Sequence, residues 1–176
     1  MVYIFLANGF EDMEAITTFD ILKRAGLEVK TVGIGAKNVK SAHGLSVIAD
    51  IEEKEFKFSN IDAIVFPGGM PGALNLKKSA VVDKAIKAAL ENDTPIGAIC
   101  AAPGVVLSGT GALCGKNYTC FPGFETDEGK YTAAKVEHDG RLITANGPGA
   151  ATEFAIEIAA AFCENEIVKS LRKDFC

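Results

Sequence analysis

The chain has 176 residues, a length typical of one domain, and 48% of them are hydrophobic, which suffices for a core without disulfides or metal ions. It carries 18 basic and 23 acidic residues, for a net charge of -5, and no dense block of Lys or Arg. We therefore expect no nucleic-acid partner, because such a surface concentrates positive charge. No apolar run is long enough to cross a bilayer, and the first residues lack the basic flank of a signal peptide, so we expect no membrane association and a cytoplasmic location.

Five cysteines are spread at irregular intervals, and no Cys-x-x-Cys pair occurs. Structural zinc sites usually place two ligands close together in the sequence, so the spacing indicates no metal site, and no cofactor motif is present. An odd number of cysteines in a reducing compartment predicts free thiols, which are available for chemistry.

The predicted elements alternate between strands and helices. In chain order we expect a strand at 2–7, a helix at 14–25, a strand at 27–34, a short edge strand or hairpin at 41–49, a strand at 61–66, a helix at 80–90, a strand at 95–99, a helix at 101–107, a strand at 118–121, a hairpin formed by 136–138 and 141–144, and a long helix at 149–169. This order predicts one α/β domain over residues 1–176, a sandwich with a mostly parallel central sheet.

Cys100 is the first candidate for a reactive residue. It stands where the apolar strand at 95–99 turns directly into a helix, and such a corner lifts one side chain above the sheet. Because the start of a helix favours a thiolate, we expect the pKa of the Cys100 thiol to be lowered. The alternative is a buried cysteine that packs as a small hydrophobic residue.

Two further segments follow strands at the same edge of the sheet. Gly68 and Gly69 belong to a glycine-rich turn after the strand at 61–66; it is either a plain tight turn or a pocket wall, in which the backbone N–H groups of Gly69 and Ala101 form an oxyanion hole. Glu14 enters an apolar helix, where burial would raise its pKa and keep it protonated. The alternative for Glu14 is an acid that stabilises a helix N-terminus.

The remaining candidate residues either have two possible interpretations or are expected at the surface. Asn146 and Pro148 precede the last helix and either close one wall of the pocket or start that helix. Glu11 and Asp12 are expected to face solvent. His43 is expected to have a surface role without catalysis, as is His138.

Three motifs together resemble the ThiJ/PfpI superfamily, in the branch of the Parkinsonism-associated protein deglycase and its bacterial and plant relatives. They are Glu11-Asp-Met-Glu14, Pro67-Gly-Gly-Met-Pro-Gly-Ala73 and Ala98-Ile-Cys-Ala-Ala-Pro103. The resemblance spans nearly the whole chain and implies a flavodoxin-like three-layer sandwich that forms a homodimer. It also implies that Cys100 is a nucleophilic, oxidisable cysteine and that Glu14 is its protonated partner.

The resemblance further implies an activity on reactive carbonyl compounds, either as a glutathione-independent glyoxalase or as a deglycase, with a small aldehyde or a glycated molecule as the substrate. A redox sensor or chaperone that uses an oxidisable Cys100 is the alternative. Cys120 and Phe121 would lie near the pocket, where Cys120 is either a resolving thiol or a small core residue.

The chain departs from its relatives at three positions. Many relatives have a histidine directly after the cysteine, where Ala101 stands, or before a proline in the later strand, where Phe121 stands. An arginine common among relatives near the second hairpin is replaced by His43. Without a histidine as general base, an intracellular peptidase or an amidotransferase-like hydrolase is less favoured.

Overall fold

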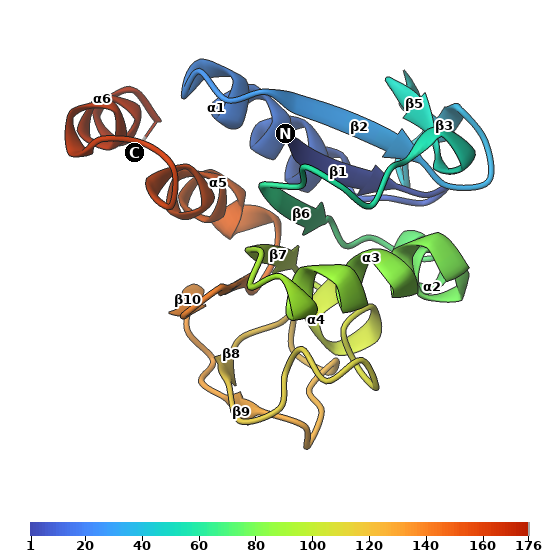
Figure 1. Ribbon diagram of the computed structural model, residues 1–176. Coiled ribbons are helices and arrows are strands. Elements are labelled where there is room, and N and C mark those ends of the chain that lie inside the picture. The colour runs from blue at the N-terminus through green and yellow to red at the C-terminus, as the bar shows by residue number, and fades with distance from the viewer. Residues whose placement is uncertain (176) are drawn as a thin grey trace.

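A seven-stranded sheet in the order β10-β11-β7-β6-β1-β2-β5 forms the centre of the computed structural model, which describes residues 1–175 (Figure 1). Its strands are β1 (Val2–Leu6), β2 (Val29–Gly33), β5 (Ile51–Glu52), β6 (Ala63–Phe66), β7 (Ile96–Ile99), β10 (Val136–Asp139) and β11 (Leu142–Ala145). Neighbouring strands are parallel, except that β10 and β11 form an antiparallel hairpin at one edge. The predicted α/β fold with a mostly parallel sheet is confirmed.

Helices cover both faces of this sheet and give the sandwich its three layers (Figure 1). They are α1 (Asp12–Arg24), α2 (Gly72–Lys78), α3 (Ala80–Glu91), α4 (Ala102–Val105), α5 (Ala151–Ala160) and α6 (Asn165–Phe175). Alternate residues of β1 point to opposite layers: Ile4 packs in the core beneath α1 and α5, and Phe5 packs in the core beneath α2 and α3. Because both faces are covered, every residue of β6 and β7 is buried, and neither strand alternates in polarity.

Two small strand pairs and a 3-10 helix lie outside the main sheet. The predicted edge strand or hairpin at 41–49 is an antiparallel hairpin of β3 (Asn38–Lys40) and β4 (Ser46–Ile48) that forms its own sheet. The predicted strand at 118–121 is shorter, because β8 covers only Asn117–Tyr118, where it pairs with β9 (Lys130–Tyr131). A 3-10 helix, η1 (Glu53–Glu55), follows β5.

The prediction of one long helix at 149–169 is wrong. This segment begins with the 3-10 helix η2 (Pro148–Ala150), continues as α5, and turns after Ala160 before α6 begins. The N–H groups of Phe162 and Cys163 both donate to the carbonyl of Ala159, which closes the turn. The two helices have different surroundings: α5 is largely buried, whereas Leu171 is the one fully buried residue that the structure describes in α6. A straight helix would have carried the apolar residues of one segment away from the core.

The helix after Cys100 is also shorter than the predicted 101–107, since α4 spans only Ala102–Val105. Gly104 lies against the backbone of the following loop, where a Cβ atom would stand 1.7 Å from the carbonyl oxygen of Phe124. This close approach places the loop that carries Cys120 beside the corner at Cys100.

Within residues 1–175, no helix combines the length and the apolar composition that a bilayer span requires.

Candidate active site

Three neighbouring strands end at the same edge of the sheet and bring the candidate residues together. Glu14 lies in the first turns of α1 after β1, Gly68 follows β6, and Cys100 follows β7. A Cβ atom added at Gly68 would lie 2.6 Å from the Cβ of Cys100 and 2.9 Å from Oε2 of Glu14. Only glycine allows this approach, so the turn after β6 packs directly against both the thiol and the carboxyl group.

Cys100 occupies a strained corner. Its φ of 63° lies in the left-handed region, which residues with a side chain rarely adopt. Its N–H donates to the carbonyl of Ala145 at 2.8 Å, and its own carbonyl accepts from the N–H of Phe121 at 2.8 Å. These two bonds hold the corner between β11 and the following loop, and the side chain is half-buried rather than sealed in the core.

Glu14 is the buried acid of the site, with 1% of the residue exposed. Its Oε2 accepts a hydrogen bond from the N–H of Gly68 at 2.7 Å, and its Oε1 has no conventional hydrogen-bond partner among residues 1–175. Burial raises the pKa of the Glu14 carboxyl to about 7, against the opposing effects of the Gly68 N–H and the Cys100 thiol. At neutral pH the carboxyl group can therefore both accept and release a proton.

The lowered pKa that we expect for Cys100 is wrong. Burial, followed by the negative charge of Glu14, raises the pKa of the thiol to about 12, although the N–H groups of Ala101 and Gly69 act in the opposite direction. Two features explain the reversal. The helix behind the sulfur is the single turn α4, whose dipole is small, and the nearest charged group is a carboxylate. The pair accommodates one negative charge, so a thiolate forms when Glu14 carries the proton.

The remaining pocket candidates lie around this corner. Asn146 and Pro148 come directly after β11, and Gly147 between them would place a Cβ atom 3.1 Å from the ring of Phe121. The Phe121 ring is 43% exposed. Cys120 is fully buried, and burial raises its pKa to about 11, which fits a core residue better than a resolving thiol.

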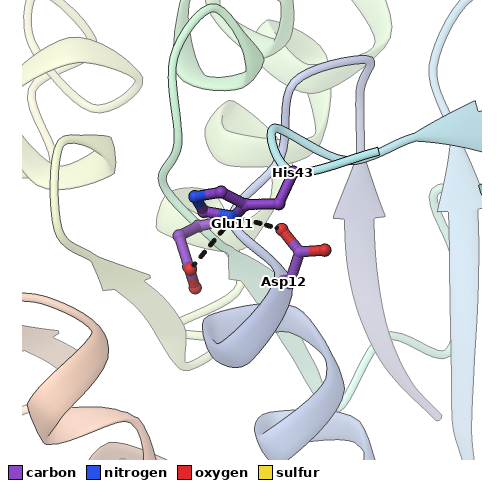
Figure 2. Close-up of side chains that lie close together, drawn as sticks. All are labelled: Glu11, Asp12 and His43. Atoms are coloured by element: carbon purple, nitrogen blue, oxygen red, sulfur yellow. Dashed lines mark hydrogen bonds and ion pairs between the residues drawn. The ribbon is translucent and has the colours of Figure 1, made fainter. Parts of the chain in front are cut away.

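A second polar cluster was not expected from the sequence. Glu11 and Asp12, expected to face solvent, have side chains only 12% and 22% exposed. Both point toward His43 in the turn between β3 and β4 (Figure 2). Nδ1 of His43 lies 2.8 Å from Oδ2 of Asp12, and this hydrogen bond and the charge of Asp12 raise the pKa of the imidazole. No sequence signal joins these residues, because the acids and the histidine lie on separate segments.

Replacing Glu14 by Gln should stabilise the folded protein above neutral pH. The folded protein retains the Glu14 proton up to about pH 7, whereas an ordinary glutamate has a pKa of 4.5, so the stability due to this proton is complete below the lower value and is lost as the pH rises to the higher one. Glu14→Gln still accepts from Gly68 but carries no charge. We expect its free energy of unfolding at about pH 8 to exceed that of the wild type by about 1–3 kcal/mol.

Urea denaturation of both proteins at acid and alkaline pH measures this difference. Glu91→Gln, which removes an exposed acid from α3, is the matched control and should show no pH-dependent gain. A Glu14→Gln protein that is no more stable than the wild type at alkaline pH would contradict the buried, raised-pKa acid.

Comparisons with known proteins show the family of the chain. The sequence profile of the DJ-1/PfpI family matches residues 1–161. The chain is 35% identical over 170 residues to the glutathione-independent glyoxalase DJR-1.2 of Caenorhabditis elegans, covering 94% of this chain and 90% of that protein. It is also 35% identical over 164 residues to Protein DJ-1 homolog B of Arabidopsis thaliana, covering 92% of this chain but only 37% of that longer protein.

The crystal structure of Drosophila melanogaster DJ-1beta shares the fold with a TM-score of 0.93 and 32% sequence identity, covering 98% of this chain and 95% of that chain. The sequence similarity extends over both strand-end segments that hold Glu14 and Cys100. The chain therefore belongs to the DJ-1/PfpI family.

Proposed function

We propose that this protein is a cysteine-dependent enzyme that acts on reactive carbonyl compounds, such as methylglyoxal, in the reducing cytoplasm. One observation carries the proposal: the Cys100 sulfur and the Glu14 carboxyl group share one corner, beneath the N–H groups of Gly69 and Ala101. A nucleophile, a proton carrier and an oxyanion site are the groups that attack on an aldehyde requires. The printed name of the C. elegans relative, a glutathione-independent glyoxalase, supports the same reaction class.

In the first step, the sulfur of Cys100 attacks the aldehyde carbon and a carbon–sulfur bond forms. The ionised Glu14 carboxylate accepts the thiol proton as this bond forms, because the raised pKa of the thiol keeps it protonated beforehand. The aldehyde oxygen becomes negatively charged and is stabilised by the N–H groups of Gly69 and Ala101 until it takes the proton from Glu14, which leaves the carboxylate ionised again. The product is a hemithioacetal.

In the second step, Glu14 moves a proton from the former aldehyde carbon to the adjacent carbon, and the hydroxyl proton of the hemithioacetal passes to the oxygen of the adjacent ketone. The first carbon is thereby oxidised to a thioester and the adjacent ketone is reduced to an alcohol, so no external oxidant or reductant is required. Water then cleaves the carbon–sulfur bond, which releases lactate and a proton and restores the Cys100 thiol. A carboxyl group with a pKa near neutrality suits both directions of proton transfer.

Lactate formation from methylglyoxal without glutathione tests the scheme. Cys100→Ala should abolish turnover, and Glu14→Gln should lower kcat/KM by about 10²–10⁴-fold, the usual contribution of a general base. The kcat/KM of the wild type should fall as the pH drops through about 7, because Glu14 becomes protonated, and this inflection should be absent from Glu14→Gln. Cys114→Ser, at an exposed cysteine, is the control. Full turnover by Cys100→Ala would refute the scheme.

A redox sensor is the second candidate function, because Glu14 can accept the proton of the Cys100 thiol and the surroundings of the sulfur would stabilise an oxidised form. Cys100 is half-buried beside backbone N–H groups, which would donate hydrogen bonds to the oxygens of a sulfinate. A protonated Glu14 would donate one more hydrogen bond to such an oxygen. Oxidation by peroxide would supply both oxygens, without a second cysteine.

Mild peroxide should therefore add two oxygens to Cys100 and leave the other cysteines unmodified, as measured by mass spectrometry of peptides. The other thiols, Cys114, Cys120, Cys163 and Cys176, serve as internal controls; Cys176 lies outside the described residues. Oxidation spread evenly over several of these cysteines would count against a sulfur that is specifically prepared for oxidation.

We propose that the active unit is a homodimer that associates through α1 and the β3–β4 hairpin. Large apolar side chains of these two elements are exposed: Met13, Ile16, Leu45 and Ile48. Ile16 and Ile48 also line a groove of about 230 Å³ between the two elements. An exposed apolar area of this kind marks an interface, and a two-fold axis would bury it against its own copy.

Light scattering should give a mass of twice 18.5 kDa for the wild type. Ile48→Glu should yield a monomer, because it places a charge at the most exposed of these side chains, 76% exposed. Leu90→Glu, on α3 outside this groove, is the matched control and should remain dimeric. A dimer that tolerates Ile48→Glu would exclude this interface.

A further inference from the structure

We propose that Glu11, Asp12 and His43 form a binding site for a divalent first-row transition-metal ion. The two acids lie at the N-terminus of α1, and the histidine lies in the turn between β3 and β4. Figure 2 shows the three side chains pointing toward one another. Within residues 1–175 this is the one cluster of three such side chains whose ligand atoms converge. The inference is independent of the proposed chemistry at Cys100.

The separations between the ligand atoms suit one ion. One atom from each side chain lies within 4.8 Å of the others. Nδ1 of His43 is 2.8 Å from Oδ2 of Asp12 and 4.0 Å from Oε1 of Glu11. Two ligands at about 2.0–2.2 Å from a metal ion are themselves roughly 3–3.5 Å apart. In the single chain the His43 side chain is 72% exposed, so a small rotation of its ring brings both separations into that range.

The protein already orients both carboxylates through their other oxygens. Oε2 of Glu11 accepts from the N–H of Glu14 at 2.8 Å, and Oδ1 of Asp12 accepts from Oγ of Ser41 at 2.5 Å. Ser41 is itself fixed, because its Oγ accepts from the N–H of Leu45 at 2.9 Å. The oxygens that face His43 are Oε1 of Glu11 and Oδ2 of Asp12, which take no part in these hydrogen bonds. Hydrogen bonds of this kind, made to the ligand side chains by neighbouring groups, orient the ligands in established metal sites.

The donor set indicates the class of ion. One imidazole nitrogen and two carboxylate oxygens suit zinc, cobalt, nickel or manganese, whereas calcium and magnesium prefer oxygen ligands throughout. A divalent ion also neutralises the two carboxylates more fully than the single positive charge of a protonated His43 does. The three protein ligands leave further positions for water.

The competing explanation is a simple ion pair between His43 and Asp12 that joins α1 to the hairpin. His43→Arg separates the two explanations, because arginine keeps a positive charge beside Asp12 but has no free nitrogen lone pair for a metal. Ser41→Ala tests orientation, since it removes the hydroxyl that donates to Asp12, together with the bond that this hydroxyl accepts from the N–H of Leu45.

Titration of the reduced full-length protein with Co²⁺ is the experiment, with visible absorption and the unfolding temperature as its two readouts. We expect one ion per chain, the weak bands of oxygen and nitrogen ligation, and a rise in unfolding temperature that reflects binding to the folded state. Ser41→Ala should weaken binding about tenfold, and His43→Arg by more than that. His138→Arg, at an exposed histidine 3.7 Å from the single acid Glu157, is the matched control and should bind as the wild type does.

Three results would overturn the proposal: no saturable binding at millimolar Co²⁺, wild-type affinity in His43→Arg, or intense sulfur-to-cobalt bands that disappear in Cys100→Ser. Cys100→Ala should still bind the ion with wild-type affinity although it lacks lactate formation. A failure of the glyoxalase scheme and a failure of the metal site are therefore separate outcomes.

Discussion

The contact between Gly68, Cys100 and Glu14 is the constraint on which the site depends. Three adjacent parallel strands deliver these residues to one edge, and the absence of a side chain at Gly68 lets the thiol and the carboxyl group share a small, largely dry volume. Burial disfavours charge on both groups, so the pKa of each is raised. One proton then passes between two atoms that cannot both be ionised, which makes the nucleophile and its base a single chemical unit.

This arrangement is held at a cost to stability. A buried acid and a left-handed φ at Cys100 both disfavour the folded state, and they persist because the surrounding structure leaves no alternative. The strand β11 accepts from the N–H of Cys100, and the loop at Phe121 donates to its carbonyl. The two apolar cores meet at this corner, since Cys100 packs against both. The packing of both cores therefore fixes the orientation of the Cys100 sulfur.

Glu11 connects this corner with the outer polar cluster. Its N–H donates to the carbonyl of Gly68 at 3.0 Å, its carboxylate caps the N–H of Glu14, and its charge contributes to the raised pKa of Glu14. The first turn of α1 therefore holds the buried acid on one side and faces His43 on the other (Figure 2). The short segment between β1 and α1 serves both places because successive residues of a helix start point in different directions.

Local patterns in the sequence were sufficient to predict the α/β class, the strand before Cys100, the burial of Glu14 and the glycine turn at 67–72, because apolar runs, glycines and the corner motif are local signals. The pKa of Cys100 could not be predicted in this way, since it depends on a carboxylate 86 positions away in the chain and on a helix that ends after one turn. The same holds for the turn after Ala160, which packing imposes on an otherwise helical pattern, and for the meeting of His43 with Asp12. Proximity between distant segments has no local signature, because it is the sheet order that creates it.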